Sequence, residues 1–237
     1  MSLGEQGDHE LFDHVLLAHD DPLNLGDRWG DSAAAVQQNL LRVSELAGFA
    51  LSSLCQVNQV HGNHVALLSA PERRQRDADG MASQDALTLA VYSADCVPVL
   101  LADGHGRVAA VHAGWRGTAA GIAGEAVAAL DRLGARRSQL RAALFPSIGP
   151  CCFEVQEDVA STFRRVQPST VTKQSNGRCV VDLWQANRLF LLQAGLHSDH
   201  IEASPACTCC DAKQFFSYRR DGAGIGQHMA YIVGGSA

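Results

Sequence analysis

Two histidines and one cysteine lie at the predicted ends of strands, where side chains can meet a ligand. His61 follows an alternating apolar and polar segment, residues 55–62, and Cys96 and His112 lie at the ends of two apolar runs. Together they offer two imidazole nitrogens and one sulfur, which suits zinc. Three protein ligands with an open fourth position are typical of catalytic rather than structural zinc. Spacing alone leaves an alternative open, in which the cysteine packs in the core and the histidines are unrelated.

The apolar runs around Cys96 and His112 predict an antiparallel hairpin. Residues 91–101 and 107–117 flank the Gly-rich turn DGHG (103–106). A tight loop pairs residues whose numbers sum to 208 or 209. The first register sets Cys96 directly opposite His112, whereas the second needs a bulge. Either register brings the thiol and the imidazole to one end of the hairpin.

Periodicity and capping residues predict the elements around this hairpin. A helix over residues 33–47 has Asp31 or Ser32 as its N-cap and Gly48 as its stop, and Thr118 caps a helix over residues 119–133. Residues 71–80 are polar and predict an exposed, mobile loop. Further helices are expected over 157–166 and 183–194, strands over 9–18, 140–145, 179–181, 201–203 and 229–233, and a rigid turn over 146–152 that forms one wall of a pocket.

Short strands with three or four amphipathic helices predict a single compact α+β domain over residues 1–237, since the sequence has no internal repeat and no low-complexity linker. The composition supports a sizeable core, with 46% hydrophobic and 19% charged residues.

Charge argues against one class of partner, and hydropathy argues against another. The formal net charge is -6, and no Lys/Arg-rich block is present, which argues against nucleic acid and favours a small solute. No apolar run reaches membrane-spanning length, and the first residues lack the basic start and apolar core of a secretory signal. We therefore expect a cytoplasmic monomer that uses no membrane and keeps its thiols for packing, metal or catalysis, although the clustered Cys207, Cys209 and Cys210 leave the question of a disulfide open.

Three more cysteines, Cys207, Cys209 and Cys210, lie close together near the C-terminus. We expect no second metal site there, because their spacing is tighter than the usual separation within a metal-binding cysteine pair. The nearest histidines in sequence are His197 and His200. The three sulfurs are therefore interpreted as packing at the end of a strand.

Four long motifs resemble the signature of the laccase-domain family. In chain order they are QVHG (59–62), SADCVPV (93–99), VHAGWRG (111–117) and FFSYRRDG (215–222). Shorter matches in the same order are LNLG (23–26), GD (30–31), IGP (148–150), DLW (182–184) and CT (207–208). The similarity covers nearly the whole chain. This family was first described as multicopper polyphenol oxidases and is now regarded as zinc-dependent purine nucleoside phosphorylases.

The resemblance implies both a fold and an activity. The implied fold is a four-layer αββα sandwich, with helices outside two packed sheets. The implied activity is phosphorolysis of adenosine and inosine to base and ribose 1-phosphate, with related action on S-methyl-5'-thioadenosine and some deamination of adenosine. Purine nucleosides and phosphate are then the partners.

The resemblance also implies roles for single residues. His61, Cys96 and His112 would bind Zn²⁺, with Cu²⁺ as the alternative, and we expect these three and Arg116 to be the catalytic residues. Arg219 and Asn24 are expected to bind substrate. Arginine binds oxyanions bidentately, so Arg116 and Arg219 suit phosphate or the leaving base. The alternative for each arginine is an ion pair with a carboxylate, for which Asp95 and Asp221 are candidates.

Two departures from the family pattern concern polar pocket residues. The family usually carries a Ser-Thr-Arg segment and a Gly-Gly-x-Ser stretch before LNLG, where this chain has only LLAHDDP (16–22). Near the C-terminus the family's Gly-Arg pair is Gly226-Gln227 here. If either missing arginine binds phosphate, phosphorolysis is slow and needs a high phosphate concentration.

Three other functions compete with the phosphorylase. A copper-dependent oxidase of phenols is one, because the same soft donors accept copper. A hydrolase is the second, with Cys96 as nucleophile, His112 as base and a backbone N–H of the Gly-rich turn as oxyanion donor. The third is a binding module that holds a purine or a metal without turnover, which the missing arginines favour.

Overall fold

Two β-sheets packed face to face form the centre of the protein, for which a computed structural model describes residues 23–26, 31–204 and 206–235. The smaller of the two has the strand order β13 (His228–Val233), β5 (Thr88–Ser93), β1 (Leu54–Asn58), β3 (Arg73–Asp77). The larger has the order β12 (Ile201–Ala203), β8 (Arg141–Leu144), β6 (Val97–Ala102), β7 (Val108–Ala113), β4 (Gly80–Ser83), β2 (Val65–Leu67). Both sheets are mixed, with parallel pairs such as β1 with β5 and antiparallel pairs such as β6 with β7.

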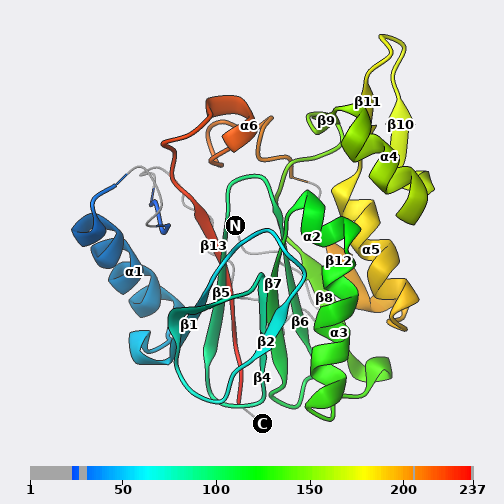
Figure 1. The fold of residues 1–237 in the computed structure, drawn as a ribbon. Coiled ribbons are helices and arrows are strands. Elements are labelled where there is room, and N and C mark those ends of the chain that lie inside the picture. Colours follow the sequence, from blue (N-terminus) through cyan, green and yellow to red (C-terminus); the bar gives the residue numbers. More distant parts are fainter. Residues whose placement is uncertain (1–22, 27–30, 205, 236–237) are drawn as a thin grey trace.

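Helices cover the outer face of each sheet and complete four layers (Figure 1). Helix α1 (Ala33–Ala47) packs on the smaller sheet through Val36, Leu40 and Val43. Helices α3 (Ile122–Arg132) and α5 (Leu183–Gln193) pack on the larger sheet. In addition to these two helix-covered layers of apolar side chains, a separate apolar cluster fills the space between the sheets. The α+β class and the αββα layers are therefore confirmed, and the described residues form one compact domain.

Alternation along the strands explains why both faces of the larger sheet are buried. In β6, Val97, Val99 and Leu101 face the helices, whereas Leu100 and Ala102 face the other sheet. Successive side chains of a strand point to opposite faces, so an uninterrupted apolar strand fits only between two covering layers. The apolar run in the sequence thus places this strand in the middle of the molecule.

The predicted hairpin exists, but both of its proposed registers are wrong. Strands β6 and β7 pair antiparallel, with Val97 opposite Ala113 and Pro98 opposite His112, so the paired numbers sum to 210. The turn is centred on His105 between Gly104 and Gly106, whose φ values of 72° and 87° favour glycine. Consequently Cys96 lies one step before the strand and not opposite His112.

The chain also changes sheets immediately before Cys96. Residues 91–101 are two strands, since β5 belongs to the smaller sheet and β6 to the larger. Asp95 lies in the connection with a φ of 98°, a backbone conformation that is strained for any residue with a side chain. Cys96 therefore lies where the chain crosses between the sheets.

Two other predicted elements need correction. The helix expected over residues 119–133 is two helices, α2 (Trp115–Ala119) and α3, separated by Gly121 with a φ of 79°. Residues 71–80 are not a loop, because β3 pairs with β1 and forms an exposed edge of the smaller sheet. Its polar sequence reflects that exposure rather than an absence of structure.

The remaining predicted elements have the expected positions. Helix α1 begins after its N-cap Ser32 and ends at Gly48, and Asp182 caps α5. Helix α4 (Glu157–Val166) is present, as are β8, β12 and β13. The strand expected over residues 9–18 lies outside the described residues.

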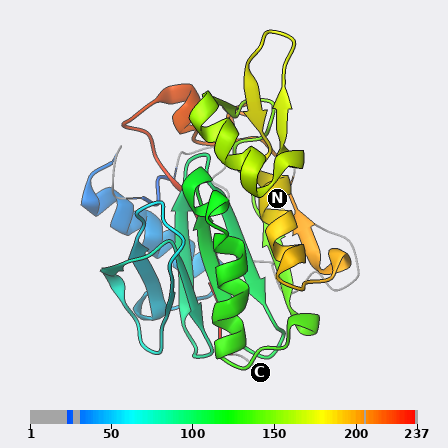
Figure 2. The ribbon, with the colours of Figure 1, turned by 45° about the vertical axis from the view of Figure 1, so that its right-hand side comes forward.

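A small subdomain extends from one end of the sandwich (Figure 2). It contains α4 and a sheet with the strand order β10 (Val171–Lys173), β11 (Cys179–Val181), β9 (Glu154–Val155). The short helix α6 (Tyr218–Asp221) lies at the same end in Figure 1. None of the helices among the described residues combines the length and apolar character needed to cross a bilayer.

Candidate active site

Three elements that are distant in sequence bring His61, Cys96 and His112 together, and we call these the three-donor group. His61 lies in the bend after β1, Cys96 lies directly before β6, and His112 is on β7. One donor atom from each lies within 4.8 Å of the others. The two imidazole rings meet edge to face with centroids 4.9 Å apart. The structure therefore assembles the three residues that the sequence suggested for zinc.

Gly114 makes this close approach sterically feasible. A Cβ atom at this position would lie 2.9 Å from His61 Cδ2 and 3.2 Å from Cys96 Sγ. Gly117 has a similar role on α2, since a Cβ there would lie only 2.4 Å from the carbonyl oxygen of Gly62. The glycines of the motif HAGWRG thus let the start of α2 pack directly against the donors.

Asp79 supports the three-donor group from behind, and sequence reasoning missed it. Its side chain is fully buried, and Oδ1 lies 2.9 Å from Nδ1 of His112. The same carboxylate accepts hydrogen bonds from the backbone amides of His61 at 2.9 Å and Gly62 at 2.6 Å. Because Nδ1 of His112 is engaged by Asp79, Nε2 is left to bind an ion. A carboxylate behind a ligating histidine is a common feature of metal sites.

The charges in the group suit a thiolate. Burial alone would raise the pKa of Cys96, but the charge of His112 and hydrogen bonds from His112 and His61 lower it to about 6. Burial would lower the pKa of His112, yet the charge of Cys96 and hydrogen bonds with Asp79 and Cys96 raise it to about 9. The pKa of Asp79 is lowered, because hydrogen bonds from His112 and the two amides outweigh the opposing effect of its burial.

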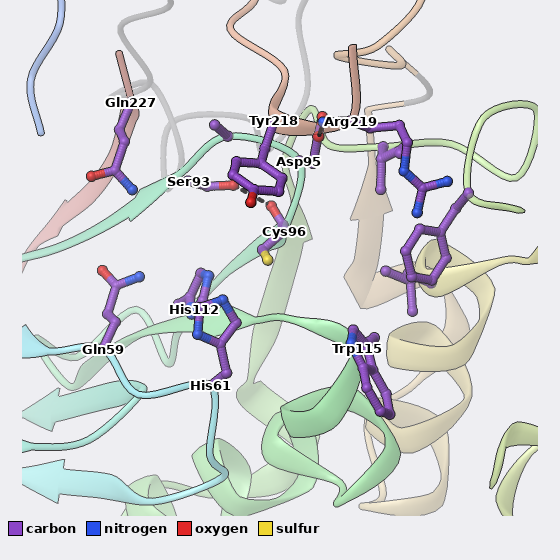
Figure 3. Close-up of a pocket in the computed structure, with 14 residues that line it drawn as sticks. Gln59, His61, Ser93, Asp95, Cys96, His112, Trp115, Tyr218, Arg219 and Gln227 are labelled. Carbon is purple, nitrogen blue, oxygen red and sulfur yellow. Dashed lines mark hydrogen bonds between the residues drawn. The ribbon is translucent and has the colours of Figure 1, made fainter. Parts of the chain in front are cut away.

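The three-donor group opens into a cavity of about 410 Å³ (Figure 3). This volume is within the usual range for sites that bind small molecules. In Figure 3, Tyr218 and Arg219 lie across the cavity from the two histidines, and Gln59 and Gln227 lie at one side. The lining residues are Gln59, His61, Ser93, Ala94, Asp95, Cys96, His112, Trp115, Ile148, Phe153, Leu183, Tyr218, Arg219 and Gln227.

Asp95 links the segments around Ile148 and Arg219, which line the cavity. Its Oδ1 accepts a hydrogen bond from the hydroxyl of Thr208 at 2.6 Å, and its Oδ2 accepts one from the amide of Arg219 at 2.6 Å. Its carbonyl also accepts from the amide of Ile148 at 2.9 Å. The strained backbone of Asp95 therefore joins two walls of the cavity directly beside Cys96.

The other three residues that the sequence suggested occupy different surroundings. Arg219 lines the cavity, and its Nη1 donates to the carbonyls of Cys152 at 3.0 Å and Glu154 at 2.8 Å. Arg116 is exposed and lies over the ring of Trp115 at 4.2 Å. Within the part of the chain that the structure describes, the cavity lining includes Arg219 and not Arg116.

Asn24 is a buried residue that builds the wall rather than lining it. Its Oδ1 accepts hydrogen bonds from the amides of Gly26 at 3.0 Å and Gln227 at 2.9 Å. It thereby positions Gln227, which does line the cavity. Residues 16–22, where the family motif is shortened, lie outside the described residues.

The three-donor group fits zinc on chemical grounds. It contains one sulfur that is readily a thiolate and two imidazoles, one of which has a carboxylate on its far nitrogen. These are borderline-soft donors that copper also accepts. Three donors facing a cavity correspond to a metal site with a position open to substrate.

Sequence reasoning missed Asp79, which lies behind the donors, and several residues that line the cavity. Asp79 precedes Gly80, a pair typical of turns, and nothing in the sequence separates it from Asp77 as a partner of histidine. Gln59 lies within the motif QVHG, and its side chain is fixed by hydrogen bonds with the backbone of Tyr92 at 2.8 Å. Trp115 and Tyr218 also lie within recognised motifs. Their positions in these motifs could have marked them as residues of the site.

Comparisons with known proteins give one consistent result. Residues 16–234 match the family model described as multi-copper polyphenol oxidoreductase laccase. Purine nucleoside phosphorylase YlmD of Geobacillus stearothermophilus is 36% identical over 226 residues, which cover 89% of this chain and 82% of that protein. Adenosine deaminase RL5, from an unknown prokaryotic organism, is 35% identical over 89% of this chain and 86% of its own length. The crystal structure of the Geobacillus YlmD superposes with a TM-score of 0.83 at 34% identity, over 90% of this chain and 85% of that one.

Proposed function

The chain belongs to the multi-copper polyphenol oxidoreductase laccase family, and we propose that it is a zinc-dependent purine nucleoside phosphorylase. Its substrates would be adenosine, inosine and S-methyl-5'-thioadenosine, each cleaved by phosphate to a free base and a sugar 1-phosphate. The observation that carries the proposal is the three-donor group at one side of a cavity of suitable volume. Relatives named as purine nucleoside phosphorylases, at 36% and 38% identity, support the choice of reaction.

The protein's own residues would bind and orient the nucleoside. Trp115, Phe153 and Tyr218 give the cavity aromatic faces on which a purine can stack. Gln59 is held rigidly by the backbone of Tyr92, so its place in the wall is fixed. Asp79 keeps Nε2 of His112 directed at the other donors. When bound, zinc supplies Lewis acidity at this point.

Phosphate would bind beside Arg219. Two backbone carbonyls hold Nη1 of its guanidinium against the cavity wall, which leaves its direction fixed before substrate arrives. Preorganised cations are effective at binding oxyanions. Arg116, stacked on Trp115 outside the lining, would make the smaller contribution. Because Gln227 stands where the family has an arginine, we expect a high phosphate requirement.

Two further activities have specific support. Deamination of adenosine is favoured by the similarity to the relative named adenosine deaminase RL5. A thiol hydrolase is favoured by the line Cys96, His112, Asp79, which matches a nucleophile, base and orienting carboxylate. His61 favours a role for Cys96 as a metal ligand over a role as a nucleophile, because a thiol hydrolase has no need of a second histidine beside Cys96.

The test is release of hypoxanthine from inosine with phosphate varied. We expect release to require phosphate, to vanish in Cys96→Ala, and to need more phosphate in Arg219→Ala than in Arg116→Ala, with zinc still bound in both arginine variants. Arg178→Ala is the matched control, because Arg178 lies between β10 and β11, pairs with Glu154 of β9 and is not among the residues that line the cavity. Release that ignores phosphate would indicate a hydrolase. Zinc-bound protein that releases no base would contradict the proposal.

A further inference from the structure

Outside the cavity lining, four cysteines converge near the surface at the same end of the molecule. Cys151 and Cys152 come from the turn after β8, and Cys207 and Cys210 come from the loop after β12. The four Sγ atoms all lie within 4.8 Å of one another. Sγ of Cys210 lies 3.6 Å from that of Cys151 and 3.4 Å from that of Cys152. We call these residues the four-cysteine group.

These separations match a tetrathiolate metal site. Zinc bonds to cysteine sulfur at about 2.3 Å, so the sulfurs of a tetrahedral site lie about 3.8 Å apart. A disulfide needs its sulfurs at about 2.05 Å, and all eight cysteines are free in the structure. Four sulfurs grouped around one point therefore fit an ion better than a bridge between any two of them.

The backbone brings the two segments together. Ser147 and Cys207 form a parallel bridge, in which the amide of Thr208 donates to the carbonyl of Ser147 at 3.0 Å. A turn in which the amide of Cys152 donates to the carbonyl of Gly149 at 3.0 Å lets two adjacent cysteines present their sulfurs on one side. These two backbone hydrogen bonds hold the two segments together without involving the thiols.

Gly149 provides both room and a hydrogen bond for this group. A Cβ at this position would lie 3.3 Å from Sγ of Cys151 and 2.8 Å from the ring of Trp184. Its amide lies 3.2 Å from Sγ of Cys207 and donates to it. Backbone amides directed at sulfur favour the thiolate, which is the form that binds a metal.

The expectation that this region holds no metal site rested on two errors. Cys207 and Cys210 are separated by two residues, which is the usual spacing of a zinc-binding pair. Cys209, which lies between them, gives the three cysteines a crowded spacing and conceals this pair. Further donors were expected only from neighbouring histidines, whereas the structure supplies Cys151 and Cys152 from the turn after β8.

We propose that Cys151, Cys152, Cys207 and Cys210 bind a second zinc ion with a structural role. Four protein donors complete a tetrahedral shell and leave no position for substrate. The thiol protons pass to solvent on binding, and no electron transfer is involved. This site stands independently of the proposed reaction.

The second ion would join two walls of the cavity. The turn that carries Cys151 and Cys152 also supplies Ile148 and leads to Phe153, both of which line the cavity. The loop after Cys210 leads to Arg219, whose Nη1 donates to the carbonyl of Cys152. Binding of an ion to both segments would therefore fix the position of Arg219 relative to the apolar wall of the cavity.

The test is the number of zinc ions per chain in protein purified under reducing conditions. We expect two in the wild type, one in Cys96→Ala, one in Cys210→Ala and none in the double variant. Cys210 is exposed, so its truncation should not prevent folding, which circular dichroism checks. X-ray absorption at the zinc edge of Cys96→Ala should show sulfur alone at about 2.3 Å.

Cys209→Ala is the matched control, since it removes a sulfur from the same loop outside the four-cysteine group. It should keep both ions. An ion count that is the same in the wild type, Cys210→Ala and Cys151→Ala would overturn the proposal, whereas a single wild-type ion that is lost in Cys210→Ala and kept in Cys96→Ala would contradict only the zinc of the three-donor group. A nitrogen shell in Cys96→Ala would also overturn the proposal, as would an intact mass two hydrogens too light in freshly reduced protein, which would indicate a disulfide.

Discussion

The three-donor group and the four-cysteine group differ in their donor atoms and in their access to the cavity. Each has an exposed member, but the three-donor group lines the cavity, with His112 only 3% exposed, whereas the four cysteines are not among the residues that line it. One group mixes nitrogen with sulfur and leaves a position open, and the other is all sulfur and complete. The different roles proposed for the two groups therefore depend on the number of donors and on access to the cavity, and not on cysteine content.

The largest expected effect is removal of a donor from either group. His112→Ala should lose the zinc of the three-donor group and reduce base release to background. Only two protein donors would remain, which is too few to retain the ion. Cys151→Ala should lose the other ion and keep measurable release, with a lower thermal unfolding midpoint. Elemental analysis, an inosine assay and a thermal scan measure these. Loss of both ions in either variant would show that the two groups are not independent.

Removing the carboxylate behind His112 should have the next largest effect. Asp79→Asn keeps the size of the side chain but loses its charge, and zinc affinity in the three-donor group should fall by about 10–100-fold. Competition with a chelator measures this affinity. Asp77→Asn is the control, because Asp77 is exposed and bonds Asn58 on the neighbouring strand. An equal effect from both substitutions would argue against the specific role of Asp79.

Adding a methyl group beside each cluster should affect the two groups separately. Gly114→Ala places a Cβ 2.9 Å from the ring of His61, and should weaken zinc binding there by about tenfold. Gly149→Ala should instead weaken the four-cysteine group, since its Cβ would lie 3.3 Å from Sγ of Cys151. Chelator competition on each variant distinguishes the two ions.

Gly124→Ala in α3 is the control for both glycines, because a Cβ there meets nothing within 4 Å. It should leave both ions in place and stabilise the protein by about 0.5–1 kcal/mol. Loss of zinc in this variant would mean that the effects at Gly114 and Gly149 arise from global destabilisation.

The smallest effect is a difference in thiol reactivity in metal-free protein. The pKa of Cys96 is lowered to about 6. The rate of its alkylation by iodoacetamide should therefore rise as the pH passes 6 and reach its maximum well below pH 9. Burial and hydrogen bonds with Cys210 and Cys207 raise the pKa of Cys151 to about 11, so its alkylation should rise only as the pH approaches 11. Peptide mass spectrometry at a series of pH values measures both. Equal midpoints would contradict the electrostatic difference between the groups.

Local signals made much of the fold predictable. Ser32 and Gly48 mark the ends of α1, and Asp182 marks the start of α5, because caps act within a few residues of the helix they bound. The apolar runs of β6 and β7 identified the central hairpin. The motifs around His61, Cys96 and His112 likewise identified the donors. These features depend on residues close together in the chain.

Tertiary structure decided what depends on residues far apart. The register of β6 and β7 followed from the placement of Gly104 and Gly106, which a count of residues could not resolve. Asp79 became a partner of His112 only because β4 pairs with β7. In the same way, Cys207 and Cys210 meet Cys151 and Cys152 through the bridge between Ser147 and Cys207. The sequence supplied the donors and their local turns, but long-range pairing of strands set their distances, since no local interaction fixes the position of one strand relative to another.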